Sequence, residues 1–272
     1  MKKLALLVLF ICALALCLTA CDKTPTYSKG LFYTLSDDGT YYSVSSIGTC
    51  SDTEIVIPST YKSLPVKAID VIAFGSCTNL TSITIPSSIT SIGDQAFAYC
   101  SSLTSITIPN SVTTIGNSVF AMCTNLESIT IPSSVTTIGE WAFSDCTSLT
   151  NVTFAEGSQL QSIGNWAFSC CTSLTSVTIP NSVTTIGNSA FRGCTSLTNI
   201  TIPNSVTTIG SFAFDGCTSL TNATFENPNG WCYSFSEDGA FGTSLPAQDL
   251  ADPAQAAEYL RAMYCYHYWV RD

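Results

Sequence analysis

The sequence predicts a repeat solenoid, in which one short coil of chain is stacked on copies of itself around a continuous core. The main observation is a regular series of Phe-x-x-Cys pairs, and the phenylalanines recur every 23 residues except for one step of 25. A period of about 20 to 50 residues is the usual signature of such an array. The second observation is that each period repeats one apolar pattern, and the third is that both ends depart from it. The pairs are Phe74/Cys77, Phe97/Cys100, Phe120/Cys123, Phe143/Cys146, Phe168/Cys171, Phe191/Cys194 and Phe214/Cys217.

The first 20 residues are typical of an export signal. Lys2 and Lys3 precede an apolar or small run from Leu4 to Ala20, which is short for a membrane span. The run ends in Leu-Thr-Ala-Cys, which resembles a bacterial lipobox, where the signal peptidase cuts before a lipid-bearing cysteine. We therefore expect residues 1–20 to be a lipoprotein signal peptide and Cys21 to be the lipidation site. The alternative is an ordinary signal peptide with a chance cysteine at its end.

The next segment predicts a tether followed by an N-terminal cap. Residues 21–29 form the expected tether and residues 30–57 the cap. Two strand-like runs, residues 31–35 and 40–44, flank the turn sequence Asp37-Asp38-Gly39. Such a sequence between strand-like runs is a strong hairpin signal. We expect this β-hairpin to cover the first coil of a solenoid that extends over residues 58–226.

One repeat unit shows how each coil folds. Ile106 and Ile108 alternate with polar residues in a Thr- and Ile-rich run, which predicts a short strand. Pro109 cannot donate to a ladder and should end that strand. Successive strands should pair in parallel, about 4.8 Å apart. Val112 and Ile115 are then expected to turn the chain back under the core.

The second half of the unit should be a short helical turn. Gly116 opens it, and Val119, Phe120 and Cys123 should point into the core. A single coil cannot bury these side chains alone, so stacking creates the core. We interpret the seven cysteines as buried, apolar side chains of this core, because parallel side chains one coil apart do not easily satisfy disulfide geometry.

Residues 227–272 break the period and predict a C-terminal cap. Asp252, Pro253 and Gln255 form a helix-start pattern, with Asp as the N-cap and Pro in the first turn. Ala257 and Leu260 place an apolar stripe on the following helix. Terminal repeats need such a covering element. We therefore expect a helical cap rather than a separate catalytic domain.

The repeat resembles the BspA-type leucine-rich repeats of bacterial surface proteins. The similarity extends from about Glu54 to Phe225, and its most specific motif is Ile-Gly-x-x-Ala-Phe-x-x-Cys-Thr-x-Leu. Residues 92–103 carry this motif with Ser in place of Thr, and residues 186–197 carry it nearly unchanged. The first copy departs, because Asp70 stands where Gly is expected. The resemblance implies a leucine-rich repeat fold, location at the cell surface and a role in adhesion.

Composition argues against several classes of function. The formal net charge is −10, and only 10% of the residues are charged. A chain this acidic with scattered Lys and Arg has no electrostatic footprint for nucleic acid, and it should reach a membrane only through the lipid anchor. His267 is the only histidine of the sequence, and no metal, phosphate-binding or nucleophile motif stands out. We expect no enzyme activity, metal or cofactor.

One candidate polar face follows the strands. A threonine recurs between the apolar strand positions and should point outward in every coil. The structural explanation is that Thr suits a pleated strand and that hydroxyls pair along the ladder. The functional alternatives are contact with a glycan or with ordered water. The candidates are Thr107, Thr130, Thr153 and Thr178.

A second candidate site lies where the repeats differ, at the second residue after the glycine. Trp141 and Trp166 occupy this position in consecutive coils, and Phe212 occupies it further along. The irregular 25-residue step falls between the two tryptophans, so an insertion loop and an aromatic pair occur at one break. Such loops and paired Trp residues often belong to binding faces. The structural alternative is that the rings only pack over the turns.

These observations lead to one expected function and two alternatives. The first is a lipid-anchored bacterial surface protein that mediates adhesion or protein–protein contact, with a host matrix or other cell-surface protein as partner. The expectation of adhesion rests on the resemblance to the BspA-type family. The second is a carbohydrate-binding surface lipoprotein, so that glycans are possible partners. The third is a passive spacer without a ligand.

Overall fold

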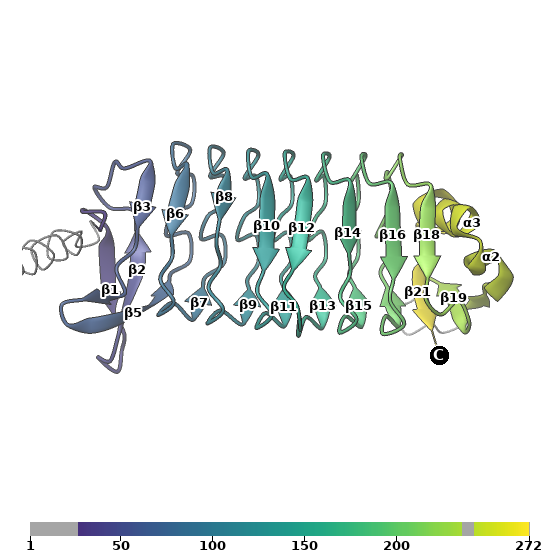
Figure 1. The fold of residues 1–272 in the computed structure, drawn as a ribbon, viewed down its shortest axis with the longest axis horizontal. Helices are drawn as coiled ribbons and strands as arrows, with labels where there is room; N and C mark the ends of the chain where they lie inside the picture. Colours follow the sequence, from purple (N-terminus) through teal and green to yellow (C-terminus); the bar gives the residue numbers. More distant parts are fainter. Residues whose placement is uncertain (1–26, 236–241, 272) are drawn as a thin grey trace, which may run out of the picture.

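The computed structural model describes residues 27–235 and 242–271, which form a solenoid of stacked coils with a cap at each end (Figure 1). Cys21, the proposed lipid site, and the predicted signal peptide lie outside the described residues. Each coil supplies a strand to each of two parallel rows and returns through a turn segment. The predicted leucine-rich repeat solenoid is confirmed.

The first row contains the strands that the Leu-x-x-Ile-x-Ile pattern predicted. Neighbouring strands pair in parallel and in register, so that Ile129 lies beside Val152 and Val177 beside Ile200. The apolar residues point inward and the threonines outward. The strands are β3 (Glu54–Val56), β6 (Ser82–Thr84), β8 (Ser105–Ile106), β10 (Ser128–Ile131), β12 (Asn151–Phe154), β14 (Ser176–Thr178), β16 (Asn199–Ile202) and β18 (Asn222–Phe225).

A second row of short strands lies where the sequence analysis expected only a turn of the chain back under the core. Thr114–Ile115 is a strand, and it pairs in parallel with Thr137–Ile138 of the next coil. Two residues are too few to show a period of two in the sequence, which is why this row was missed. The strands are β5 (Leu64–Ile69), β7 (Ser91–Ile92), β9 (Thr114–Ile115), β11 (Thr137–Ile138), β13 (Ser162–Ile163), β15 (Thr185–Ile186) and β17 (Thr208–Ile209).

The third side of each coil is a run of tight turns, which we call the turn face. Bonds of the i→i+3 type close the segment, as expected for helical turns, for example from Cys123 N to Phe120 O at 3.1 Å. A continuous helix does not form, because Ser118 and Met122 have φ values of +53° and +61°. The backbone instead bonds to the next coil, as in Phe120 N to Ala142 O at 2.8 Å.

The core contains a continuous stack of phenylalanine rings along the solenoid axis, surrounded by buried Ile, Leu and Val side chains. Rings of successive coils lie 5.1–5.5 Å apart between centroids, from Phe74 to Phe214. The cysteines of the pairs pack beside them, and they also act as donors. The thiol of Cys146, for instance, lies 3.2 Å from the carbonyl oxygen of Phe120 in the preceding coil. These thiols therefore link coils as well as fill space.

The N-terminal cap contains the predicted hairpin. Strand β1 (Phe32–Leu35) pairs antiparallel with β2 (Tyr42–Ser46), and β4 (Thr60–Tyr61) pairs with β5. The Asp38 carboxylate orders the turn by accepting from Ser36 Oγ at 2.7 Å and from Thr40 N at 3.0 Å. The cap also explains the irregular Asp70, whose carboxylate accepts from Ser43 Oγ at 2.8 Å.

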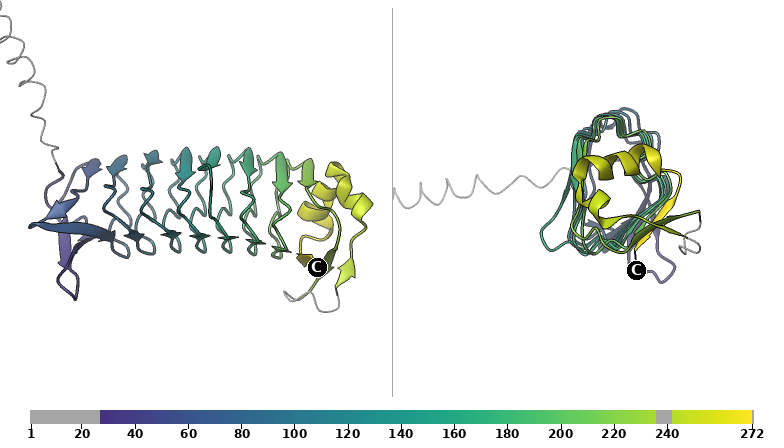
Figure 2. Two further views of the ribbon diagram at one scale, coloured as in Figure 1. Left: turned by 60° about the horizontal axis from the view of Figure 1, so that its bottom comes forward. Right: turned by 90° about the vertical axis from the view of Figure 1, so that its right-hand side faces the viewer.

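The C-terminal cap covers the last coil with helices and antiparallel strands (Figure 2). As predicted, the Asp252 carboxylate caps the helix that starts at Pro253, and Ala257 and Leu260 are buried. Strand β21 adds to β17 and so ends the second row. The elements are β19 (Trp231–Ser234), β20 (Thr243–Ser244), α2 (Ala247–Ala251), α3 (Pro253–Glu258), a π-helical turn (Tyr259–Met263) and β21 (Tyr268–Arg271).

Candidate functional site

Trp141 and Trp166 form a stacked pair on the turn face. Their ring centroids are 4.7 Å apart and their planes differ by 7°. Trp141 is 41% exposed, and Trp166 is partly buried. The two indoles therefore pack on each other, as the structural alternative held, and still present apolar surface to solvent.

Close to Trp141, the turn face presents two exposed apolar side chains that the sequence analysis missed. Tyr99 is 55% exposed and Met122 is 37% exposed, and both precede the cysteine of their coil. Together with Trp141 and Asp145 they line a groove of about 290 Å³ that crosses neighbouring coils. A comparison of the residue before each cysteine would have revealed them, because this position varies as much as the Trp position.

All four of these groove residues have left-handed backbone conformations. The φ values are +62° at Tyr99, +61° at Met122 and +58° at Trp141. An L-residue in this region costs about 1–2 kcal/mol relative to a right-handed conformation, and a bulky residue there is unusual. Gly193 and Gly216 occupy the Tyr99 position in later coils, with φ near +70°. The repeat can thus place glycine here, yet this groove carries large side chains.

Phe212 is covered by the C-terminal cap. Its ring meets Tyr266 edge-on with centroids 5.2 Å apart, and its backbone N–H bonds to the Cys265 carbonyl. The coil that contains Ser189 separates it from Trp166. The structure therefore brings Trp141 and Trp166 together but places Phe212 in the packing of the cap.

The candidate threonines form an exposed column on the first row of strands. Within the described residues, the hydroxyls of Thr107, Thr130 and Thr178 make no hydrogen bond, and Thr153 accepts one from Asn151 Nδ2 at 3.3 Å. A neighbouring column behaves differently. Thr104, Thr150 and Thr198 donate to carbonyls of the preceding coil at 3.1–3.4 Å. Ladder bonding thus explains the second column and leaves the hydroxyls of the first available.

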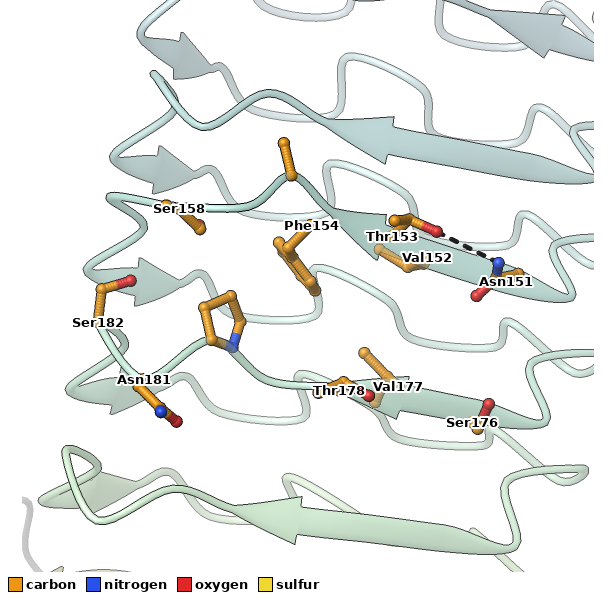
Figure 3. Close-up of a pocket in the computed structure, with 13 residues that line it drawn as sticks. Asn151, Val152, Thr153, Phe154, Ser158, Ser176, Val177, Thr178, Asn181 and Ser182 are labelled. Atoms are coloured by element: carbon orange, nitrogen blue, oxygen red, sulfur yellow. Dashed lines mark hydrogen bonds between the residues drawn. The ribbon is translucent and has the colours of Figure 1, made fainter.

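The insertion opens a pocket of about 450 Å³ on this strand face, between the coils of β12 and β14 (Figure 3). Thr153 and Thr178 line it together with Phe154, Ser158 and Asn181. The sequence predicted that the insertion and the Trp pair would meet. The structure separates them, because the inserted loop precedes β13 and Trp166 follows it. The pocket and the groove are consequently distinct sites with different linings.

Charge is distributed unevenly along the chain. Between Lys67 and Arg192 the sequence contains no Lys or Arg, whereas it contains six acidic residues. One of them, Asp145, lines the groove and accepts from Ser144 Oγ at 2.6 Å. The first ion pair after this stretch joins Arg192 to Asp215 at 2.9 Å. The middle coils therefore form a uniformly acidic body.

The cysteines and His267 take up structural positions. Burial raises the pKa of the Cys123 thiol to about 12 and that of Cys146 well above its ordinary value, so these thiols stay protonated. The Cys265 thiol donates to Ala262 O at 3.4 Å. His267 packs against Tyr233 with centroids 4.9 Å apart. In the described part of the chain, no three His, Cys, Asp or Glu side chains converge on a metal site.

Comparison with known proteins places the chain in a family. The sequence model of the "BspA type Leucine rich repeat region" matches residues 40–160 and 113–238, with six copies. This span covers most of the chain, and the protein belongs to the BspA-type leucine-rich repeat family. A search among curated proteins found no significant match.

Two solved structures show the same fold. The leucine-rich repeat protein of T. pallidum is 29% identical with a TM-score of 0.65, over 72% of this chain and 90% of that one. A leucine-rich cell surface protein of Faecalibacterium prausnitzii A2-165 is 32% identical with a TM-score of 0.64. That match covers 78% of this chain and 59% of the other. Across residues 27–235 and 242–271, none of the helices has the length and apolarity needed to cross a membrane.

Proposed function

We propose that this protein is a lipid-anchored bacterial surface protein whose turn face binds a basic partner protein, either a host matrix protein or another cell-surface protein. The observation that carries the proposal is the set of large apolar side chains at left-handed positions of the groove. Membership of the BspA-type family and the surface location stated for the F. prausnitzii relative support it.

Folding alone gives no reason for these side chains. Strained, exposed residues cluster at functional sites more often than elsewhere. Tyr99 and Met122 stand where Gly193 and Gly216 avoid the strain, and Trp141 stands where Ser118 and Ser189 suffice in other coils. Exposed Trp and Tyr are also the side chains that contribute most to protein interfaces. The groove therefore has the composition of an interface centre.

The acidic charge of the middle coils favours a basic partner protein. Asp145 lines the groove, and no positive side chain lies in the sequence between Lys67 and Arg192. An acidic surface attracts a basic one and repels acidic competitors, and this steering weakens as salt screens it. The preferred partner presents Lys or Arg beside an apolar side chain.

Surface plasmon resonance against immobilised fibronectin, laminin and collagen IV tests the proposal, with lysozyme and serum albumin as basic and acidic comparison proteins. The test variant combines Trp141→Ser with Trp166→Ser, since Ser is the native residue at positions 118 and 189. We expect at least tenfold weaker binding to a bound matrix protein and weaker binding at higher salt. Thr130→Val, on the strand face, is the control and should bind normally. If no matrix protein binds, a host matrix protein is excluded as the partner. If the Trp variant binds like the control, the turn face is not the binding site and the proposal fails.

The lipid anchor has its own test. Cells fed an alkyne-labelled fatty acid should label the wild-type protein and a Cys17→Ala variant, because Cys17 lies inside the predicted signal peptide. A Cys21→Ala variant should lose the label. Persistent labelling of Cys21→Ala would exclude the anchor.

A further inference from the structure

We propose that the pocket between the coils of β12 and β14 binds an uncharged carbohydrate chain. This site is independent of the turn-face groove, since the two share no lining residue. The proposal rests on how the pocket arises, on its lining, and on the hydroxyl column that continues on both sides of it.

The pocket arises from local departures from the repeat. Phe154 stands where Ile131 and Ile179 are 0% and 3% exposed, yet Phe154 is only partly buried. Ala155 replaces the usual proline and bonds back to Ile131 O at 3.0 Å. The ladder between β12 and β14 is also shorter, since it pairs two residues where β10 and β12 pair four. These changes hold the coils apart and uncover one face of an aromatic ring.

The lining combines polar and apolar groups and carries no charged residue. Ser176 and Thr178 are exposed, and their hydroxyls make no hydrogen bond within the described residues, so they are available as donors and acceptors. Asn181, on the same coil, adds an amide to the lining, and on the other coil Asn151 holds Thr153 by a bond of 3.3 Å. A ligand with formal charge would find no counter-charge here, whereas a polyhydroxylated neutral ligand would find partners on both coils.

One buried hydroxyl adds to this set. Ser182 lines the pocket, and its Oγ atom is buried and has no hydrogen-bond partner among the described residues. The equivalent Ser134 instead donates to Val112 O at 2.6 Å. Ser88 and Ser205, which occupy the same position in other coils, also have buried Oγ atoms without partners. Ser182 is therefore an additional donor in the pocket, and an unpartnered serine at this position does not define the site.

Shape and the aromatic ring favour a sugar over other neutral ligands. The volume of about 450 Å³ falls within the range of about 300–1,000 Å³ typical of small-molecule sites. The Phe154 ring points from the end of β12 into the space between the coils (Figure 3). A sugar ring has an apolar face of C–H groups that packs on such a ring, while its hydroxyl edge reaches the side chains of the rim.

The surroundings favour a chain over a single sugar. Thr130 on β10 and Thr201 on β16 continue the exposed hydroxyl column to either side of the pocket. Neighbouring strands are about 4.8 Å apart, which is close to the length of one sugar residue. An oligosaccharide lying across the strands would thus place its central residue in the pocket and its outer residues over hydroxyls.

Isothermal titration calorimetry on the full-length chain tests this proposal. The probes are hexasaccharides of α-1,4-glucose, β-1,4-glucose, β-1,4-mannose and β-1,4-N-acetylglucosamine, in a detergent without a sugar headgroup. Phe154→Ala removes the ring and Thr178→Val removes a hydroxyl without changing shape. Thr84→Val makes the same change on β6, three strands before β12 and beyond the reach of a hexasaccharide centred on the pocket, and is the matched control. A further variant replaces residues 155–160 with Pro-Ser-Ser-Val, the native residues 132–135, and restores the regular period.

We expect one hexasaccharide class to bind. It should bind Phe154→Ala and Thr178→Val about tenfold more weakly than wild type, and it should bind Thr84→Val as it binds wild type. The regular-period variant should fold with an unchanged circular dichroism spectrum and should not bind. Absence of binding to all four probes would overturn the proposal. Equal binding by the regular-period variant, or equal losses in Thr178→Val and Thr84→Val, would also overturn it. Matrix-protein binding by these variants reports separately on the turn face.

Discussion

Trp141 and Trp166 stack with their planes 7° apart although both backbones are left-handed, with φ values of +58° and +51°. Aromatic pairs contribute about 0.5–1.5 kcal/mol beyond area burial. A double-mutant cycle with Trp141→Ser and Trp166→Ser should therefore give a coupling free energy of about 1 kcal/mol. Urea unfolding followed by circular dichroism measures it.

A control cycle combines Trp141→Ser with Phe212→Ser, three coils away. Because distant sites add to within about 0.5 kcal/mol, this cycle should show no coupling. If the effects of Trp141→Ser and Trp166→Ser on the free energy of unfolding were also additive, the stack would contribute nothing to stability.

Met122 tests the cost of the left-handed positions. Its φ of +61° is poorly suited to a β-branched residue, whereas glycine adopts it freely. Met122→Val should therefore lower the free energy of unfolding by at least about 1 kcal/mol relative to Met122→Gly. Thermal melts of both variants check the difference. Equal melting temperatures would show that the backbone relaxes and that the wild-type residue is not strained.

The sequence predicted those parts of the fold whose signals are local or repeated. The Phe-x-x-Cys series located the core, Asp38 and Gly39 located the hairpin, and Asp252 located the start of the cap helix. Thr114–Ile115 could not be identified, because a two-residue strand is defined by pairing with the next coil and not by its own pattern.

The candidate sites were only partly predictable for a similar reason. Matched positions in consecutive coils were enough to make Trp141 and Trp166 neighbours. The partial exposure of Phe154 depends on how far two coils separate, and the partial burial of Phe212 depends on where Tyr266 returns. Both depend on contacts between segments that are distant in the sequence or displaced by an insertion. No local sequence pattern therefore predicts them.

The buried thiols predict a loss of stability in alkali. In the folded state burial raises the pKa of Cys123 from the ordinary value of 9.0 to about 12, and it raises the pKa of Cys146 and Cys171 as well. Above pH 9 the unfolded chain loses these protons and the folded chain keeps them, so stability is full below pH 9 and falls above it. Each such thiol contributes a slope of up to about 1.4 kcal/mol per pH unit.

Urea unfolding at pH 8, 9 and 10 measures this slope. A Cys123→Ala variant, less stable at pH 8, should lose stability less steeply between pH 9 and 10 because one titrating group is gone. A slope identical to that of wild type would mean that Cys123 ionises alike in both states.

Gly139 tests how closely the coils approach on the turn face. A Cβ atom added there would lie 2.6 Å from the Gly116 carbonyl carbon and 2.7 Å from its oxygen, both backbone atoms of the preceding coil. Gly139→Ala should therefore lower the free energy of unfolding by about 1–3 kcal/mol, as overpacking does in other cores. Ser133→Ala, in the same coil, should change it by less than about 0.5 kcal/mol. If Gly139→Ala were as stable as this control, the coils would have to separate without cost, and close backbone approach could not be the reason that glycine recurs there.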